Sequence, residues 1–266
     1  MTHLPSNAAK LVATQYRTTG NLQARSRLHQ RFATNPYDWM AWVFDQWPAL
    51  PPNARVLEAG CGTGRLWEVN AGRVPAGWSL TLTDQSSAMV EQADATLAAS
   101  KLAAQARVLV APADQLPAEP GSIDLIVANH MLYHVPDLPA TLREFRRVLK
   151  PGGWLCAATN GDAHMGELNT LYHDFAGEAG RMSMALSFTL ENGADLMRPV
   201  FPEIALIRRP NQLRVDDAEA LADYIESMVP GQTRREPLLA YVREAMRKAG
   251  GVIVITTDSG LFLARG

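Results

Sequence analysis

The sequence contains only two cysteines, Cys61 and Cys156, among its 266 residues. Both lie in apolar stretches that we predict to be buried in a sheet, so neither a disulfide framework nor a cysteine metal site is implied. The chain has no run of about eighteen apolar residues, and residues 1–9 lack the basic and apolar regions of a secretion signal. We therefore expect no membrane partner and a cytoplasmic location.

Charge of one sign is also not in excess, since the formal net charge is −2. Nothing in this balance favours a nucleic-acid partner. Apolar residues make up 47% of the chain and charged residues 20%, so a large core can be buried as one domain with appendages. The sequence has no internal repeat, and a monomer or a homodimer is expected.

The most informative stretch runs from Val56 to Trp67, where an apolar strand leads through three alternate glycines into a predicted helix. Gly60, Gly62 and Gly64 let the backbone bend sharply and pass close to a ligand, because glycine carries no Cβ. A dinucleotide-binding fingerprint needs its third glycine where this chain has Arg65. The pattern therefore predicts a nucleotide-binding turn and disfavours NAD.

Two further predicted strands lead to acidic residues. Residues 79–84 are apolar and β-branched and end at Asp84, about twenty residues beyond the glycines. Ligands of open parallel sheets bind outside the carboxyl ends of the strands, so Asp84 is expected to accept hydrogen bonds from two ribose hydroxyls. The alternative is a helix N-cap for residues 86–100. A third strand, residues 107–113, leads to Asp114 and Gln115, and the sequence does not decide which of them faces a ligand.

A fourth predicted strand, residues 123–128, is followed by the segment 129–137 and by a helix with apolar residues at helical spacing. Lys150-Pro151-Gly152-Gly153 ends this helix before a fifth strand at 154–159. This order of elements, with the glycine turn, Asp84 and Asp114, resembles the core of class I S-adenosylmethionine-dependent methyltransferases across residues 53–160. The resemblance is to the bacterial small-molecule type, and it implies S-adenosyl-L-methionine as the cofactor.

The rest of the chain completes the fold that this resemblance implies. We expect an α/β, Rossmann-like, seven-stranded and mostly parallel sheet that ends in an antiparallel C-terminal hairpin. Residues 201–208 are predicted as a strand, residues 218–228 and 238–249 as helices, and residues 251–264 as strand, turn at 258–260 and strand. Residues 1–50 are expected to form an N-terminal helical lid. Residues 51–266 are expected to form the methyltransferase domain, with a helical substrate-cap insertion after the fifth strand at about 161–200.

The resemblance also implies which residues contact the cofactor. In the lid, Tyr16 and Arg25 are expected to face the methionine moiety, whereas Trp39, Trp42 and Trp47 are expected to pack the lid onto the sheet. The predicted cofactor-binding residues are Tyr16, Arg25, Glu58, Gly60, Cys61, Gly62, Gly64, Asp84, Gln85, Met89, Ala113, Asp114, Gln115, Asn129 and His130.

Polar side chains that follow the fourth and fifth strands should meet on one rim, because adjacent strand ends lie side by side. The predicted substrate contacts are Tyr133, Asn160, His164 and Tyr172.

The same rim supplies two candidates for a general base. His134 and His164 can accept a proton near neutral pH, since an unperturbed imidazole has a pKa of about 6.5. A hydrogen bond that only holds the loop explains His134 equally well. A metal site of His130, His134, His164 and Glu167 is disfavoured, because the four-residue spacing in a loop does not guarantee a shared face. No metal is predicted.

The favoured function is O- or N-methylation of a small organic molecule, because the additions to the core are aromatic and enclosing while the charge is slightly acidic. Methyl transfer mainly requires alignment of nucleophile, carbon and sulfur, so proximity supplies most of the acceleration. One alternative is a protein or RNA methyltransferase, which needs an open groove and, for RNA, a basic face. The other is a cofactor-binding module without catalysis.

Overall fold

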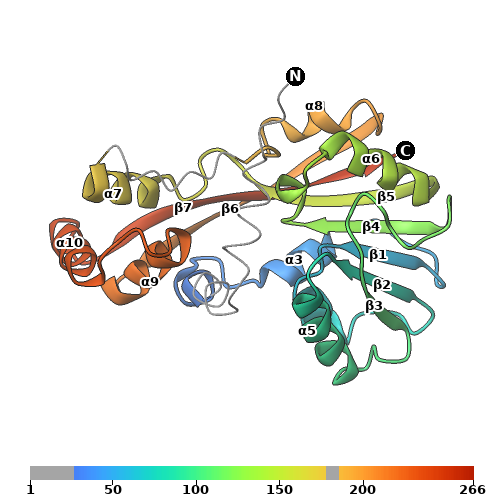
Figure 1. Cartoon of the computed structure of the whole chain (residues 1–266), viewed down its shortest axis with the longest axis horizontal. Coiled ribbons are helices and arrows are strands. Elements are labelled where there is room, and N and C mark those ends of the chain that lie inside the picture. The colour runs from blue at the N-terminus through green and yellow to red at the C-terminus, as the bar shows by residue number, and fades with distance from the viewer. Residues whose placement is uncertain (1–26, 178–185) are drawn as a thin grey trace. The chain divides into compact units, whose positions relative to one another are not determined.

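The computed structural model describes residues 27–177 and 186–266 (Figure 1). Tyr16 and Arg25 lie outside the described residues. The chain divides into two compact units. The larger unit comprises residues 37–160, 187–208 and 259–266, and the described part of the smaller comprises residues 27–36, 161–177, 186 and 209–258.

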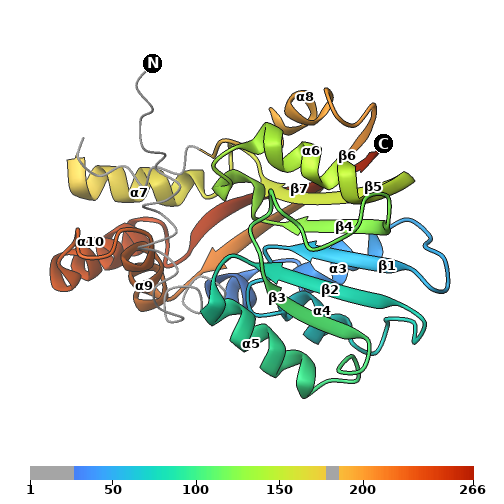
Figure 2. The same cartoon turned by 45° about the vertical axis from the view of Figure 1, so that its right-hand side comes forward.

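The described residues contain a seven-stranded sheet with the order β3-β2-β1-β4-β5-β7-β6, whose strands lie side by side in Figure 2. The pairs among β1 to β5 are parallel, and β7 runs antiparallel to β5. The predicted Rossmann-like α/β fold is confirmed. The strands are β1 (Arg55–Ala59), β2 (Ser79–Asp84), β3 (Ala106–Val110), β4 (Ile123–Asn129), β5 (Leu149–Asn160), β6 (Glu203–Val215) and β7 (Ile253–Arg265).

Alternate residues of the central strands enter two different apolar clusters, as expected for strands buried on both faces. Leu57 and Ile126 belong to one cluster, and Val56 and Leu125 to the other. Helices α6 (Leu138–Val148) and α8 (Gly193–Met197) contribute to the first cluster; α3 (Trp39–Asp45), α4 (Arg65–Asn70) and α5 (Ser87–Ala98) contribute to the second. Because both faces are covered, polar side chains can meet a ligand mainly where the strands end.

The predicted turn at residues 258–260 is wrong, because β7 continues through it. Ser259 and Gly260 pair with Asn160 and Thr159 of β5, and the Ser259 hydroxyl donates to the Asn160 side-chain oxygen at 2.7 Å. A Cβ on Gly260 would stand only 2.6 Å from the carbonyl oxygen of Ile207 in β6. The glycine is therefore needed for the close approach of β6 and not for a change of direction.

The smaller unit is helical around parts of β6 and β7. Its apolar cluster draws on residues 27–32, which are helical, and on α7 (Gly166–Ala176), α9 (Ala218–Met228) and α10 (Arg235–Lys248). The fully buried members include Leu168, Leu221 and Val242. This cluster is the core that holds the three labelled helices together.

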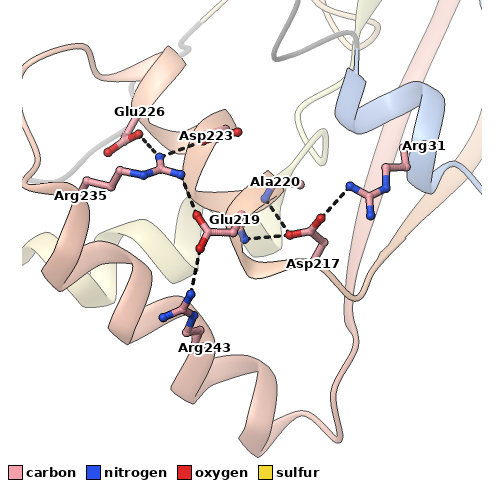
Figure 3. Close-up of polar contacts among 8 residues, drawn as sticks. All are labelled: Arg31, Asp217, Glu219, Ala220, Asp223, Glu226, Arg235 and Arg243. Carbon is pink, nitrogen blue, oxygen red and sulfur yellow. Dashed lines mark hydrogen bonds and ion pairs between the residues drawn. The ribbon is translucent and has the colours of Figure 1, made fainter.

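A network of charged side chains adds to that core on the surface of the smaller unit (Figure 3). Asp217 caps α9 by accepting from the Glu219 and Ala220 N–H groups, and it also pairs with Arg31 at 2.7 Å. Such exposed ion pairs each contribute little, about 0–1 kcal/mol, so they set helix orientation more than stability. Arg235 of α10 reaches three carboxylates of α9, those of Glu219, Asp223 and Glu226.

The two units differ from the predicted division at residue 50 and at about 161–200. α3 lies within the expected lid but belongs to the larger unit, because Val43 is buried in its second apolar cluster. Residues 187–208 also belong to the larger unit, where Phe188 and Met197 are buried in the first cluster. The smaller unit instead extends over residues 209–258.

Both cysteines are buried and unbridged. Within the described ranges, no helix combines the length and the apolar character needed to cross a membrane. The same part of the chain has no group of three or more His, Cys, Asp or Glu side chains placed to hold a metal ion.

Gly260→Ala is expected to destabilise the protein by about 1–3 kcal/mol, because the added methyl group overlaps the Ile207 carbonyl. Urea unfolding measures this loss. Gly166→Ala is the matched control: residue 166 begins α7, and no described atom lies within 4 Å of the Cβ position. This control should leave stability unchanged or raise it, since alanine is the better helix former. Equal stability of the two variants would contradict the close approach of β6.

Candidate functional site

The glycine turn joins β1 to α4 at the carboxyl end of the parallel strands. Gly60, Gly62 and Gly64 have φ angles of +69°, +54° and +77°, which residues with a Cβ adopt only at a cost. A Cβ on Gly60 would lie 2.8 Å from Met131 Cβ, and one on Gly64 would lie 3.4 Å from Ala93 Cα. No described atom lies within 4 Å of the Cβ position on Gly62. The turn is thus enclosed by protein at both ends and open in the middle.

Asp84, at the end of β2, is tied to this turn. Its Oδ2 accepts from the Gly62 N–H at 3.0 Å, and its Oδ1 accepts from the Ser86 N–H at 2.9 Å. The alternative prediction that Asp84 caps the following helix is wrong, because the N-cap of α5 is Ser86, whose hydroxyl accepts from the Met89 N–H. A carboxylate can accept about four hydrogen bonds. Asp84 is therefore fixed beside the open part of the turn with acceptor capacity remaining.

Glu58 lies in β1, immediately before the turn. Glu58 is only 2% exposed, and its Oε2 accepts from the Trp67 indole N–H at 2.7 Å. Burial raises the pKa of Glu58 to about 8, the Trp67 bond opposes this shift, and the nearby charge of Asp84 adds to it. The carboxyl group is therefore mainly neutral at pH 7, and it anchors α4 to β1. Direct contact with the cofactor stays a prediction.

The predicted cofactor residues after β2 and β3 lie next to each other, since the Ala111 N–H donates to the Asp84 carbonyl at 3.0 Å. Burial raises the pKa of the Cys61 thiol, so this residue offers its backbone to the turn and not a thiolate. By exposure, Cys61 and Met89 are buried, Ala113 and Asp114 are half-buried, and Gln85 and Gln115 are exposed.

Asn129, the last residue of β4, faces helix α3. Its Oδ1 accepts from the Trp39 indole N–H at 3.2 Å, and its Nδ2 lies 3.1 Å from the Met40 sulfur. His130 follows with a φ of +55°, and its N–H donates to the Ala158 carbonyl at 3.0 Å. The rings of His130 and Trp39 are 5.2 Å apart. Trp39, for which the sequence predicts only packing, thus lies at the rim formed by the strand ends.

A row of rings continues from His130 into the short 3-10 helix η1 (Leu132–His134). The ring centroids of His130 and Tyr133 are 6.4 Å apart, and those of Tyr133 and His134 are 4.4 Å apart. All three residues are half-buried. Met131, in the same segment, occupies the space beside Gly60. The structure therefore brings Tyr133 and His134 to the same part of the larger unit as the turn.

The other predicted substrate residues fall differently. Asn160 is 7% exposed, and its side-chain oxygen accepts from Ser259, so it holds β5 to β7. His164 and Tyr172 belong to the smaller unit. The His164 ring stacks on His29 at 6.0 Å, and Tyr172 is buried in the apolar cluster, where burial raises the pKa of its hydroxyl. Structural contacts account for much of the Asn160 and Tyr172 surfaces, and their substrate roles stay predictions.

Sequence reasoning missed the link between α3 and the turn. Asp38 caps α3 by accepting from the Met40 N–H at 2.7 Å, and its second oxygen pairs with Arg65 at 3.0 Å. In the sequence, Arg65 stands where a dinucleotide fingerprint has glycine. This position disfavours NAD but does not indicate that Arg65 pairs with Asp38. The available signal was Asp38 followed by an aromatic helix, which is a typical helix start.

The comparisons with known proteins agree with this geometry. Residues 57–157 match the family model described as a methyltransferase domain. The chain is 38% identical over 102 residues to the ubiquinone/menaquinone biosynthesis C-methyltransferase of Geotalea daltonii. This match covers 38% of this chain and 43% of the relative. It is 38% identical over 109 residues to a ubiquinone biosynthesis O-methyltransferase of Xanthomonas campestris pv. campestris, covering 41% and 44%. The matches thus span less than half of either relative.

Among solved structures, phosphoethanolamine N-methyltransferase 2 of Haemonchus contortus, in complex with phosphomonomethylethanolamine and S-adenosylhomocysteine, superposes with a TM-score of 0.60. The two chains are 18% identical, and the superposition covers 98% of this chain and 60% of the other. At this identity the likeness supports the fold alone.

The chain carries a class I S-adenosylmethionine-dependent methyltransferase domain. The predicted family and its cofactor are thereby confirmed. The residues of the methyltransferase turn also fit the cofactor: no described atom lies within 4 Å of the Cβ position on Gly62, and the carboxylate of Asp84 is held beside it. That Asp84 accepts from the two ribose hydroxyls stays a prediction.

Gly62→Ala in the methyltransferase turn should weaken binding of S-adenosylhomocysteine by about tenfold or more, because the methyl group enters the open part of the turn. Gly64→Ala is the matched control. Both variants should lose about 1–2 kcal/mol of stability, since both residues have a positive φ, but Gly64→Ala places its Cβ against α5 and should keep its affinity within about threefold. Calorimetry and urea unfolding measure both quantities. Equal affinities would contradict a cofactor at Gly62.

Glu58 predicts a pH dependence of stability. Its pKa rises from 4.5 to about 8 on folding, so the folded state binds the extra proton. Stability should fall as pH rises from about 4.5 to about 8, by at most about 1.4 kcal/mol per pH unit, and level off above. Glu58→Gln keeps an oxygen for the Trp67 N–H and removes the titration. In urea unfolding, the stability difference should shift in favour of the variant between about pH 5 and 8; a constant difference would contradict a neutral Glu58.

Proposed function

We propose that the chain transfers the methyl group of S-adenosylmethionine to an oxygen or nitrogen atom of a small organic molecule. The observation that carries this proposal is the open glycine turn with Asp84 fixed beside it, next to the half-buried rings that follow β4. Aromatic rings favour a flat organic acceptor. A net charge of −2 gives no general attraction to RNA.

In this proposal the residues of the turn, Asp84, and the segments after β2 and β3 hold the cofactor. When bound, S-adenosylmethionine supplies an electrophilic methyl group on a positively charged sulfur. The Asp84 carboxylate, which is fixed beside Gly62, would accept hydrogen bonds from the ribose, and the backbone of Gly60 to Gly64 would hold the methionine portion. The main task of the protein is then to orient the acceptor toward the methyl group, because alignment of the reacting atoms supplies most of the rate acceleration.

An acceptor that is protonated at neutral pH must also lose its proton. Within the larger unit, His134 is the proposed base, because a neutral imidazole nitrogen can accept that proton. Tyr133, whose ring stands at an edge to His134 at 4.4 Å, orients it. His164 belongs to the smaller unit, and the base role that the sequence suggests for it stays a prediction. The lid role of residues 1–50 and the cofactor contacts of Tyr16 and Arg25 stay predictions, and α3 within that range belongs to the larger unit.

The two curated relatives are by name a C-methyltransferase and an O-methyltransferase of ubiquinone biosynthesis. These names support a small acceptor, and the first adds carbon as a candidate acceptor atom. The test is to incubate the full chain with methyl-labelled S-adenosylmethionine and panels of phenols, amines, total RNA and protein extract. Label transfer to a small molecule is expected. Transfer only to RNA or protein favours the macromolecular alternative, and tight cofactor binding without any transfer favours a non-catalytic module.

Asp84→Ala should weaken cofactor binding by about 2–4 kcal/mol, because two charge-assisted hydrogen bonds to the ribose are lost. Asp124→Ala is the matched control. Asp124 also accepts a backbone N–H, from Arg55 at 2.8 Å, and pairs with Lys150 at 2.7 Å, but it lies near the start of β4, at the opposite end of the parallel strands. This control should lose stability and keep its affinity. A loss below about tenfold in Asp84→Ala would count against the ribose contact.

A further inference from the structure

We infer that Trp39 is a positioning residue of the methyltransferase site, which fixes Asn129 and the ring of His130 at the carboxyl end of β4. This inference rests on the proposed function, since it concerns the same site. It adds to that site a residue of α3, a helix outside the matched region 57–157. The sequence predicts only a packing role for Trp39.

Trp39 differs in its contacts from Trp47, which follows it in the same segment. The Trp47 ring lies 4.5 Å from that of Phe44, 5.8 Å from that of Trp67 and 6.4 Å from that of Trp78, all within or against the apolar cluster. Trp39 also packs against this cluster and lies 5.1 Å from the Trp42 ring, but its indole N–H in addition makes a directed contact, since it donates to Asn129 at 3.2 Å. A directed bond from a side chain to the end of a strand fixes orientation, which packing alone does not.

Helix α3 gives Trp39 a fixed base that does not depend on β4. The side-chain amide of Asn70 in α4 donates to the Met40 carbonyl at 3.1 Å, and Arg65 of α4 pairs with the capping residue Asp38. Arg73 pairs with Asp45 at the other end of α3. The Trp39 bond therefore joins the α3–α4 pair to the end of β4.

Both the oxygen and the nitrogen of the Asn129 side-chain amide contact residues of α3. The oxygen accepts from Trp39, and the nitrogen lies 3.1 Å from the Met40 sulfur. These two contacts set the direction of the amide plane. In this inference Asn129 therefore contributes by fixing the start of the segment that carries His130.

His130 has the left-handed backbone that non-glycine residues rarely adopt, with a φ of +55°. Such a conformation costs about 1–3 kcal/mol and persists where the surroundings hold it. Here the holding contacts are the N–H bond to the Ala158 carbonyl and the ring of Trp39. The conformation turns the chain back, so that Met131 reaches Gly60 and the rings of His130 and Tyr133 come beside each other. Trp39 thereby supports the segment that adjoins the cofactor turn.

The test uses Trp39→Phe, which keeps a ring on α3 and removes the N–H donor. In the full chain, titration calorimetry should show an affinity for S-adenosylhomocysteine lowered about tenfold. The NMR signals of His130 should change even without ligand, including the backbone coupling constant that reports its φ, which the altered ring current of residue 39 does not affect. These signals are identified by their loss in His130→Asn, since asparagine tolerates a left-handed backbone.

Trp47→Phe is the matched control, because it makes the same change in the apolar cluster. It should lower the unfolding midpoint at least as much as Trp39→Phe, yet leave the His130 signals and the affinity for S-adenosylhomocysteine unchanged. A loss of affinity in Trp47→Phe as large as that in Trp39→Phe would overturn the inference, since general destabilisation would then explain both.

Asn129→Leu and the double variant Trp39→Phe/Asn129→Leu test whether the two residues act together. If Trp39 acts through Asn129, the double variant loses no more affinity than the larger single loss, within about twofold. Additive losses overturn the inference.

Unchanged affinity in Trp39→Phe overturns the inference too, while binding by the wild type leaves the proposed function standing. If the wild type does not bind S-adenosylhomocysteine, the proposed function fails, and the coupling constant that reports the φ of His130 alone decides: a change in Trp39→Phe supports the inference, and no change overturns it.

Discussion

The hydrogen bond from the Gly62 N–H to the Asp84 carboxylate joins the two strand ends on which the site is built. It can form because β1 and β2 run parallel and in register, with Ala59 opposite Thr83, so that both strands end at the same level. Gly62 has a positive φ, and no described atom lies within 4 Å of its Cβ position. The same geometry therefore fixes the acid and leaves room for a ligand.

The parts of the fold that follow from local pattern could be predicted from the sequence. Strands β1, β2 and β4 are apolar runs buried on both faces, and the helices α5 and α6, which follow β2 and β4, begin at the recognisable caps Ser86 and Asp137. The turn expected at 258–260 failed for a long-range reason. Asp, Ser and Gly are typical of turns, but Gly260 is needed because the Ile207 carbonyl of β6 approaches it. Local composition cannot distinguish these two uses of glycine.

In the candidate site, too, the residues that follow a local pattern could be predicted, and the contacts between distant segments could not. Gly60, Gly62, Gly64 and Asp84 could be found because strand, turn and acid follow one another at fixed spacing. The contact of Trp39 with Asn129 joins residues 90 positions apart in the sequence, and no periodicity of α3 indicates which of its aromatic residues meets β4. Likewise, the substrate contacts expected of Asn160 and Tyr172 ignored their structural partners, because Ser259 and the apolar cluster of the smaller unit come from distant segments.

Two carboxyl groups lie close to the turn, and their surroundings give them different tasks. Glu58 is enclosed by the core and bound to Trp67, and burial raises its pKa to about 8, so it adds little negative charge at pH 7. Asp84 is half-buried and accepts hydrogen bonds from the Gly62 and Ser86 N–H groups. A single negative charge is therefore placed at the end of β2, where a ribose can donate to it. A second charged acid directly beneath the turn would repel the first, and burial of Glu58 avoids that repulsion.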